Sequence, residues 1–261
     1  MSLNELIIRA DKSALIILEK MKNFDCLKQE YLDILRKIDE SFFNTNHENS
    51  KVTEGLSGLF LASEPDNYWN AKNKIMIIGA ETRAWNINLQ QDYSLNEYLS
   101  ESIKKNKNFF KKMLSEPRSK KITFHDFTRS IADHSGSDGL VYCNLFCFSW
   151  KEKSPINSKY FSFIKDLSFE LLNAQINYFE PHIIIFANGS QNTVYRRELF
   201  NPCFYSEGKH YADQGISKNQ LYQFIYKKKI ICYKIQHPST IRGKSLAKAA
   251  RVKLLELLPI K

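Results

Sequence analysis

The chain has 261 residues, 43% of them hydrophobic, which is enough for one sizeable core. Its net charge of +10 favours polyanionic partners such as nucleic acid without identifying one. Five cysteines without a Cys-x-x-Cys pair argue against a disulfide framework and indicate a reducing compartment. Because no signal peptide and no apolar stretch of roughly 18 residues is present, we expect a cytoplasmic protein without a membrane partner.

The N-terminal segment predicts helices. Residues 3 to about 43 carry apolar side chains at helical spacing, with an interruption near Phe24, and this pattern fits two helices. A polar stretch follows and is typical of a loop. We therefore divide the chain into an N-terminal helical extension, residues 1–50, and an α/β domain, residues 51–261. The ordinary role of such an apolar-faced helix pair is to cap a sheet.

Apolar, β-branched-rich runs predict four strands, at about 75–78, 141–143, 182–187 and 229–235. Helical patterns between or after them cover residues 95–114, 161–176 and 245–258. Alternating strands and helices imply a mostly parallel sheet. The expected fold is a three-layer α/β/α sandwich with a central, mostly parallel four-stranded sheet.

A basic run follows the first strand. Residues 104–121 hold eight basic side chains against one Glu. Such runs are usually solvated helix faces, but a basic edge can also bind phosphates, and the sequence supports both interpretations.

Three predicted strands lead directly to polar residues. The first is followed by Gly79-Ala80-Glu81, the second by Asn144, and the last by His237-Pro238-Ser239. Because carboxyl ends of parallel strands meet at one edge of a sheet, we expect a carboxylate, an amide and an imidazole to converge there. This set suits hydrolysis of a bond to a heterocyclic leaving group.

The order and spacing of these motifs resembles the uracil-DNA glycosylase superfamily. Its members carry a water-positioning motif after the first strand, an Asn after a second and a His-Pro-Ser loop near the end. His182–Gly189 is similar to the family's strand-then-glycine segment, so the likeness spans about Gly58 to the C-terminus. It implies a monofunctional DNA glycosylase that flips a base out of DNA and excises it with water, leaving an abasic site.

The resemblance also implies roles for individual residues. Glu81 orients a water or stabilises the sugar cation, Asn144 reads the base, and His237 donates a hydrogen bond to the departing base. The structural alternatives are a helix N-terminal acid for Glu81 and a buried strand-end amide for Asn144. Further base-binding positions are Gly79, Ala80, Arg83 and Trp85, of which Trp85 fits the core equally well. The DNA-binding positions are Ser239, Ile241, Arg242 and Lys244.

Two residues depart from the uracil-specific pattern. Glu81 stands where that pattern has an Asp, and its extra methylene shifts the water that it orients. Arg83 stands where the pattern has a Tyr that excludes the methyl group of thymine, and an Arg can contact a phosphate or a polar base substituent. The substrate therefore stays open between uracil and a modified pyrimidine. Hypermodified phage cytosine is one such base, and its removal would be an antiviral defence.

Other patterns point away from cofactors. His125-Asp126 and Asp133-His134 lack metal-ligand spacing, and neither a nucleophile elbow nor a phosphate-cradling glycine loop occurs, so we expect no metal and no nucleotide cofactor. Cys143 and Cys147 lie in a hydrophobic segment and fit small buried side chains. We expect a monomer that binds DNA. The alternatives are a catalytically inactive nucleic-acid-binding protein of the same fold, and a hydrolase of free nucleosides.

Overall fold

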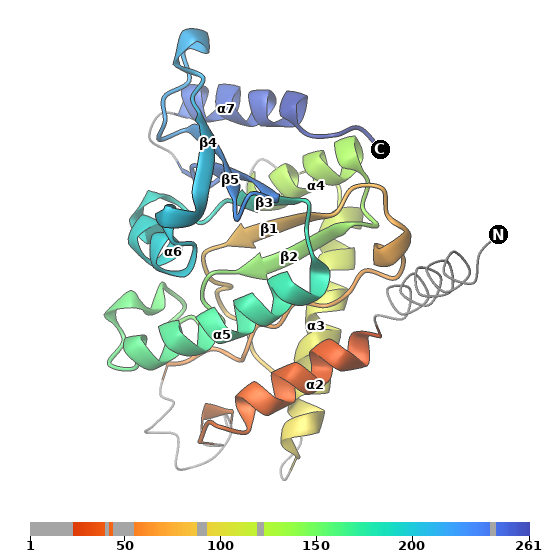
Figure 1. Ribbon diagram of the computed structural model, residues 1–261. Helices are drawn as coiled ribbons and strands as arrows, with labels where there is room; N and C mark the ends of the chain where they lie inside the picture. Colours follow the sequence, from red (N-terminus) through yellow and green to blue (C-terminus); the bar gives the residue numbers. More distant parts are fainter. Residues whose placement is uncertain (1–22, 40–41, 44–54, 88–92, 119–122, 241–243) are drawn as a thin grey trace, which may run out of the picture.

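A computed structural model of the chain describes residues 23–39, 42–43, 55–87, 93–118, 123–240 and 244–261 (Figure 1). The first predicted helix of the N-terminal extension lies outside these residues, as do Ile241 and Arg242. Within the described ranges, no helix is both long and apolar enough to cross a membrane.

The centre of the molecule is a six-stranded mixed sheet in the order β2-β1-β3-β6-β5-β4. Strands β2, β1, β3 and β6 run parallel, whereas β5 and β4 are antiparallel additions at one side. The strand bounds are β1 (Ile75–Gly79), β2 (Leu140–Asn144), β3 (Ile183–Phe186), β4 (Tyr205–Lys209), β5 (Leu221–Tyr226) and β6 (Ile230–Ile235). The α/β class is confirmed.

The predicted count of four strands differs from the six observed. The four predicted runs form the four parallel strands. Every residue of β1, β2 and β3 is buried, and this burial explains why their sequences are almost continuously apolar. The two additional strands carry weaker signals. Strand β4 at the sheet edge is half-buried to exposed and polar, as edge strands often are.

Six helices are described: α2 (Phe24–Leu35), α3 (Leu95–Ser115), α4 (Thr123–Ser135), α5 (Phe161–Phe179), α6 (Thr193–Leu199) and α7 (Lys244–Leu257). Figure 1 shows α5 on one side of the parallel strands and α4 and α7 on the other. Helix α3 begins with a capping box in which Ser94 and Glu97 satisfy each other's backbone N–H groups. Helix α2 buries Leu27 and Tyr31 in the same core as the sheet, so the described part of the N-terminal extension packs on the domain.

The strand order places a crevice at the carboxyl edge of the sheet. From β1 the chain proceeds to β2 on one side and then crosses back to β3 on the other. Loops that leave β1 and β3 therefore diverge, and open α/β sheets bind ligands at such a switch point. The crevice therefore lies between the loops that follow Gly79 and Phe186.

Candidate functional site

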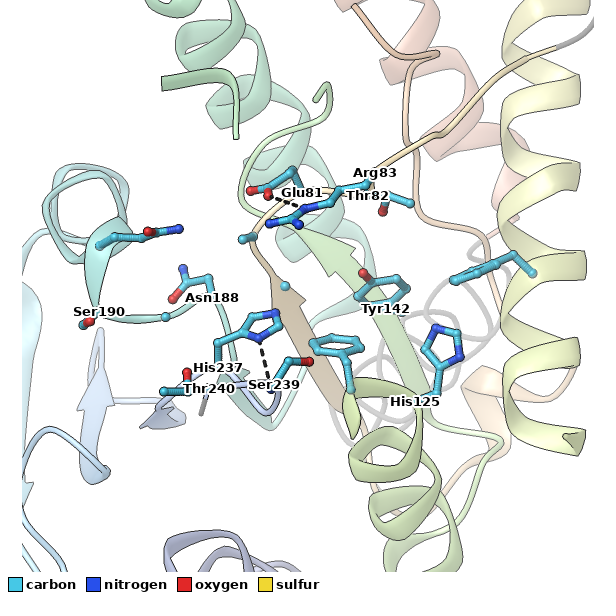
Figure 2. A pocket seen from close by; sticks show the side chains of 16 residues that line it. Glu81, Thr82, Arg83, His125, Tyr142, Asn188, Ser190, His237, Ser239 and Thr240 are labelled. Atoms are coloured by element: carbon cyan, nitrogen blue, oxygen red, sulfur yellow. Dashed lines mark hydrogen bonds and ion pairs between the residues drawn. The ribbon is translucent and has the colours of Figure 1, made fainter. Parts of the chain in front are cut away.

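A pocket of about 690 Å³ opens at this edge and has the size of a small-molecule site. The loops after β1, β3 and β6 all contribute to its lining, together with side chains from α3, α4 and β2 (Figure 2). The predicted residues that it brings together are Gly79, Ala80, Glu81, Arg83, His237 and Ser239. His125, for which a metal-ligand role was not expected, also lines the pocket. The lining residues without a predicted site role are Thr82, Phe109, Phe124, Tyr142, Asn188, Gly189, Ser190, Gln191 and Thr240.

Glu81 lies at the start of the loop that follows β1, residues 80–85, here called the β1 loop, and its side chain is only 4% exposed. One carboxylate oxygen is 3.6 Å from Nε of Arg83, whose own side chain is 68% exposed. The other oxygen, Oε2, is buried and has no hydrogen-bond partner in the structure. Burial raises the pKa of the Glu81 carboxyl, and the nearby Arg83 guanidinium opposes this rise. One oxygen of the carboxylate therefore remains without a hydrogen-bond partner on a residue that lines the pocket.

Trp85 anchors the far end of the β1 loop in the core. Its ring is buried, and its indole N–H donates to the Leu59 carbonyl at 3.0 Å. Ala84, just before it, adopts a left-handed φ of 50°, a strained conformation for a residue with a side chain. Trp85 does not line the pocket, so the core alternative fits it better than a role as a stacking wall.

Asn144 is buried at the end of β2 and does not line the pocket. Its amide fits best with the oxygen accepting from the Thr82 N–H at 3.2 Å and hydroxyl at 2.5 Å, and the nitrogen donating to the Tyr142 hydroxyl at 3.0 Å. A Cβ on Gly79 would lie 2.5 Å from the Asn144 side-chain amide, so glycine leaves room for this amide. Asn144 thus positions the β1 loop through Thr82, which matches its structural alternative.

Aromatic side chains form one wall of the pocket. Phe124 of α4 lies between Tyr142 and His237, with ring centroids 5.4 Å and 5.6 Å away, and it stacks on the His237 imidazole at 26°. Phe109 of α3 joins this wall and packs against Trp85 behind it. A planar ligand can stack against such a surface.

His237 presents a hydrogen-bond donor to the pocket. Its Nδ1 accepts from the Ser239 backbone N–H at 3.2 Å, so the neutral imidazole carries its proton on Nε2 (Figure 2). A turn closed by the Thr240 N–H and the His237 carbonyl holds the loop. Burial, followed by the charge of Arg83, lowers the pKa of His237, which favours the neutral donor form.

Asn188 follows β3 and lines the opposite side of the pocket from Tyr142 (Figure 2). Asn188 is 2% exposed, and its side-chain amide nitrogen has no hydrogen-bond partner in the structure. No site role is predicted for it from the sequence, although it follows a predicted strand just as Glu81 does. That position after a strand was the available signal.

The predicted DNA-binding residues are only partly described. Ser239 is exposed at the pocket rim and accepts a hydrogen bond from the Thr123 hydroxyl at 2.9 Å. Lys244 begins α7, but its side chain, like Ile241 and Arg242, lies outside the described part of the chain. In the basic run, carboxylates pair with Lys104, Lys107, Lys111, Lys112 and Arg118. This pairing favours the interpretation as a solvated helix face.

The described residues contain no group of three or more His, Cys, Asp or Glu side chains that could hold a metal. Cys143 and Cys147 are buried as free thiols, and burial raises the pKa of Cys147 to about 12. The pocket instead offers an acceptor from Glu81, donors from His237 and Asn188, and a flat aromatic wall. Comparison of the sequence with protein-family models and with curated proteins found no match.

Proposed function

We propose that the protein is a monofunctional DNA glycosylase that removes uracil or a modified pyrimidine and leaves an abasic site. One observation carries the proposal: a buried carboxylate, Glu81, and an imidazole donor, His237, face the same pocket from different strands. Breaking a glycosidic bond with water requires charge stabilisation at the sugar and at the leaving group. These two side chains supply one each.

In this mechanism the C1′–N bond breaks and the base departs with the bonding electron pair. Nε2–H of His237 donates to the base oxygen on which negative charge develops. Glu81 stabilises the positive sugar and orients the water, whose oxygen bonds to C1′ while its proton passes to the carboxylate. The raised pKa of Glu81 makes the carboxylate a better base than an exposed one.

The pocket suits a base that has left the stack. A target within a duplex must be extruded before a side chain can reach it, and stacking on Phe124 and Tyr142 would offset part of that cost. A volume of about 690 Å³ exceeds that of an unmodified pyrimidine and leaves room for a substituent. We therefore include substituted cytosines, such as those of phage DNA, among the proposed substrates, with antiviral defence as the corresponding role.

Arg83 is proposed as the contact to a phosphate or to a polar base substituent. Its guanidinium is mostly exposed and lies next to Glu81 at the pocket, where an anionic ligand would find it. The proposal also takes the parallel strands, with helices on both sides, as the three-layer sandwich that the resemblance implies. The proposed active species is a monomer bound to DNA.

A strand-scission assay tests the proposal. Labelled duplexes carrying uracil, hypoxanthine, 5-hydroxymethylcytosine or glucosylated cytosine are incubated with the protein and treated with alkali. We expect cleavage at one of these bases and its loss in the Glu81→Gln variant. Cleavage that persists in Glu81→Gln would remove the carboxylate from the mechanism.

The second candidate is a catalytically inactive nucleic-acid-binding protein. It is favoured by the amide of Asn144, which is committed to Thr82 and Tyr142 rather than to the pocket. This candidate predicts that no base is released and that Glu81→Gln and His237→Ala bind DNA as the unmodified protein does. Measuring binding and base release on the same three proteins separates the two candidates.

A further inference from the structure

Asn188 lines the pocket and carries a buried hydrogen-bond donor that has no partner. The residue is 2% exposed, it lines the pocket, and its Nδ2 has no hydrogen-bond partner in the structure. A buried amide nitrogen without a partner opposes folding, because the group has lost its water. Such an atom at the wall of a pocket indicates that a ligand supplies the missing acceptor.

The backbone holds this side chain in a defined position. Asn192 donates from its own amide to the Asn188 carbonyl at 2.6 Å, and the preceding Ala187 N–H donates to Ile78 at 2.9 Å. Gly189 follows with φ 79° and ψ 166°, a conformation that is essentially restricted to glycine. Asn188 is therefore fixed between a strand end and a constrained turn, as a recognition residue needs to be.

The loop that carries Asn188 lies close to the proposed leaving-group donor. A Cβ built on Gly189 would be 3.5 Å from Cβ of His237, so the two loops are in contact. Figure 2 shows Asn188 and His237 on one side of the pocket and Tyr142 across from them. A planar base in the pocket would thus lie near both an imidazole and an amide.

We propose that Asn188, rather than Asn144, reads the hydrogen-bonding edge of the base, an inference that rests on the proposed function. The matching ligand is a pyrimidine with an acceptor and a donor side by side. Uracil offers O4 and N3–H, whereas cytosine offers N3 and its exocyclic amino group. The carboxamide can pair with either one by reversing its oxygen and nitrogen, and Asn144 is left to hold the β1 loop.

Two substitutions test this role. Asn188→Leu keeps the branched shape but removes both hydrogen-bonding groups, whereas Asn188→Asp offers only acceptors when ionised. The matched control is Asn96→Asp, at an exposed position in the first turn of α3. Titration of each protein with free uracil and free cytosine, followed by NMR, measures base binding, and thermal unfolding is measured alongside.

We expect Asn188→Leu to weaken base binding at least tenfold without lowering the melting temperature, because it removes an unpaired donor. Asn188→Asp should also weaken binding of both bases at least tenfold, because an ionised carboxylate accepts from the one donor of each base but has no hydrogen for the neighbouring acceptor. Asn96→Asp should bind as the unmodified protein does. Unchanged affinity in Asn188→Leu, or a clear fall in its melting temperature, would overturn the inference.

Base release from DNA, assayed on the same proteins, separates this inference from the proposed function. A protein that binds the free base through Asn188 but releases none from DNA supports the inference and contradicts the hydrolysis. A protein that releases the base at equal rates with and without Asn188→Leu contradicts the inference and supports the hydrolysis. If the unmodified protein neither binds nor releases a base, both are overturned.

Discussion

The pocket and the basic face of α3 differ in whether their polar side chains have partners. In the pocket, Glu81, His125 and Asn188 each bury a side-chain atom that has no partner within the described structure. On α3, carboxylates lie beside four lysines, Lys104, Lys107, Lys111 and Lys112. The first region holds unmet hydrogen-bonding capacity, and the second satisfies its charges internally.

This difference identifies the functional region better than charge does. Each buried polar atom without a partner costs about 1–3 kcal/mol of folding free energy. Such atoms also occur elsewhere in the described structure, for example at Asn106 and Gln175, so it is the position of these three on residues that line a pocket that points to a ligand. Exposed ion pairs contribute little and are screened by salt. A run of lysines is conspicuous in a sequence, yet the three uncompensated atoms are the stronger sign of a site.

The largest effect is expected at Glu81. Glu81→Gln should slow base release by about 10²–10⁴-fold, because it removes the group that activates water. The free energy of unfolding should not fall, since the neutral amide has no charge to desolvate. Single-turnover base release and urea unfolding check both parts, and a large loss of stability would instead assign Glu81 to the fold.

The raised pKa of Glu81 also predicts a pH dependence. The reaction needs the carboxylate, so base release should decline as pH falls through the raised pKa. Stability should change the other way. Between pH 4.5 and the raised pKa, the native state binds more protons than the unfolded state, so lowering the pH stabilises the native state. Glu81→Gln should lose this stability gradient, which unfolding curves across the acidic range can detect.

The next largest effect is expected at His237. Replacement by Ala should cost about 10²–10³-fold in rate, the loss typical of one oxyanion donor.

The lowered pKa of His237 also predicts a pH dependence of stability. The unfolded chain takes up the proton first, so stability should decrease as pH falls below 6.5. His237→Ala should lack that decrease. His210→Ala, at an exposed position outside the pocket, is the control and should leave base release unchanged.

A moderate effect is expected where the β1 loop is held. Gly79→Ala places a methyl group against the Asn144 amide and should destabilise the fold by about 1–3 kcal/mol. Asn144→Ala leaves Thr82 without its partner and should cost a similar amount, about 1–3 kcal/mol. The double variant should lose less than the sum, because both changes disturb one contact. Full additivity in urea unfolding would show that the two residues act separately.

The smallest effect is expected on the basic face. Lys107→Ala and Lys111→Ala remove partners of the exposed Asp66 and should barely change stability or DNA affinity. The salt dependence of DNA binding should also be unchanged. If either lysine contacts a phosphate, the slope of log affinity against log salt should instead fall by about 0.9.

Much of the fold could be predicted because buried parallel strands have continuous apolar sequences. The runs that end at Gly79 and Asn144 form neighbouring strands, paired in register at their ends. Strands β4 and β5 were missed because they mix polar and apolar residues at the antiparallel side of the sheet. Helix α4 was also missed, although it brings Phe124 to the pocket.

Site residues could be predicted from the sequence only where the end of a strand carries them to the edge of the sheet. Glu81 and His237 follow strands and therefore reach the sheet edge. The positions of Asn144 and Asn188 along their strands are similar, but one amide packs on Gly79 and the other faces the pocket. That difference arises from side-chain contacts between distant segments, which the sequence does not display.

The most direct test is to measure, by mass spectrometry, the free base released from duplexes that carry uracil or a substituted cytosine. The unmodified protein and Glu81→Gln are compared under identical conditions, with the melting temperature of each recorded. We predict release of one base by the unmodified protein, at least a 100-fold loss in Glu81→Gln, and a melting temperature that does not fall. Equal release by both proteins, or no release of any base by the unmodified one, would contradict the account.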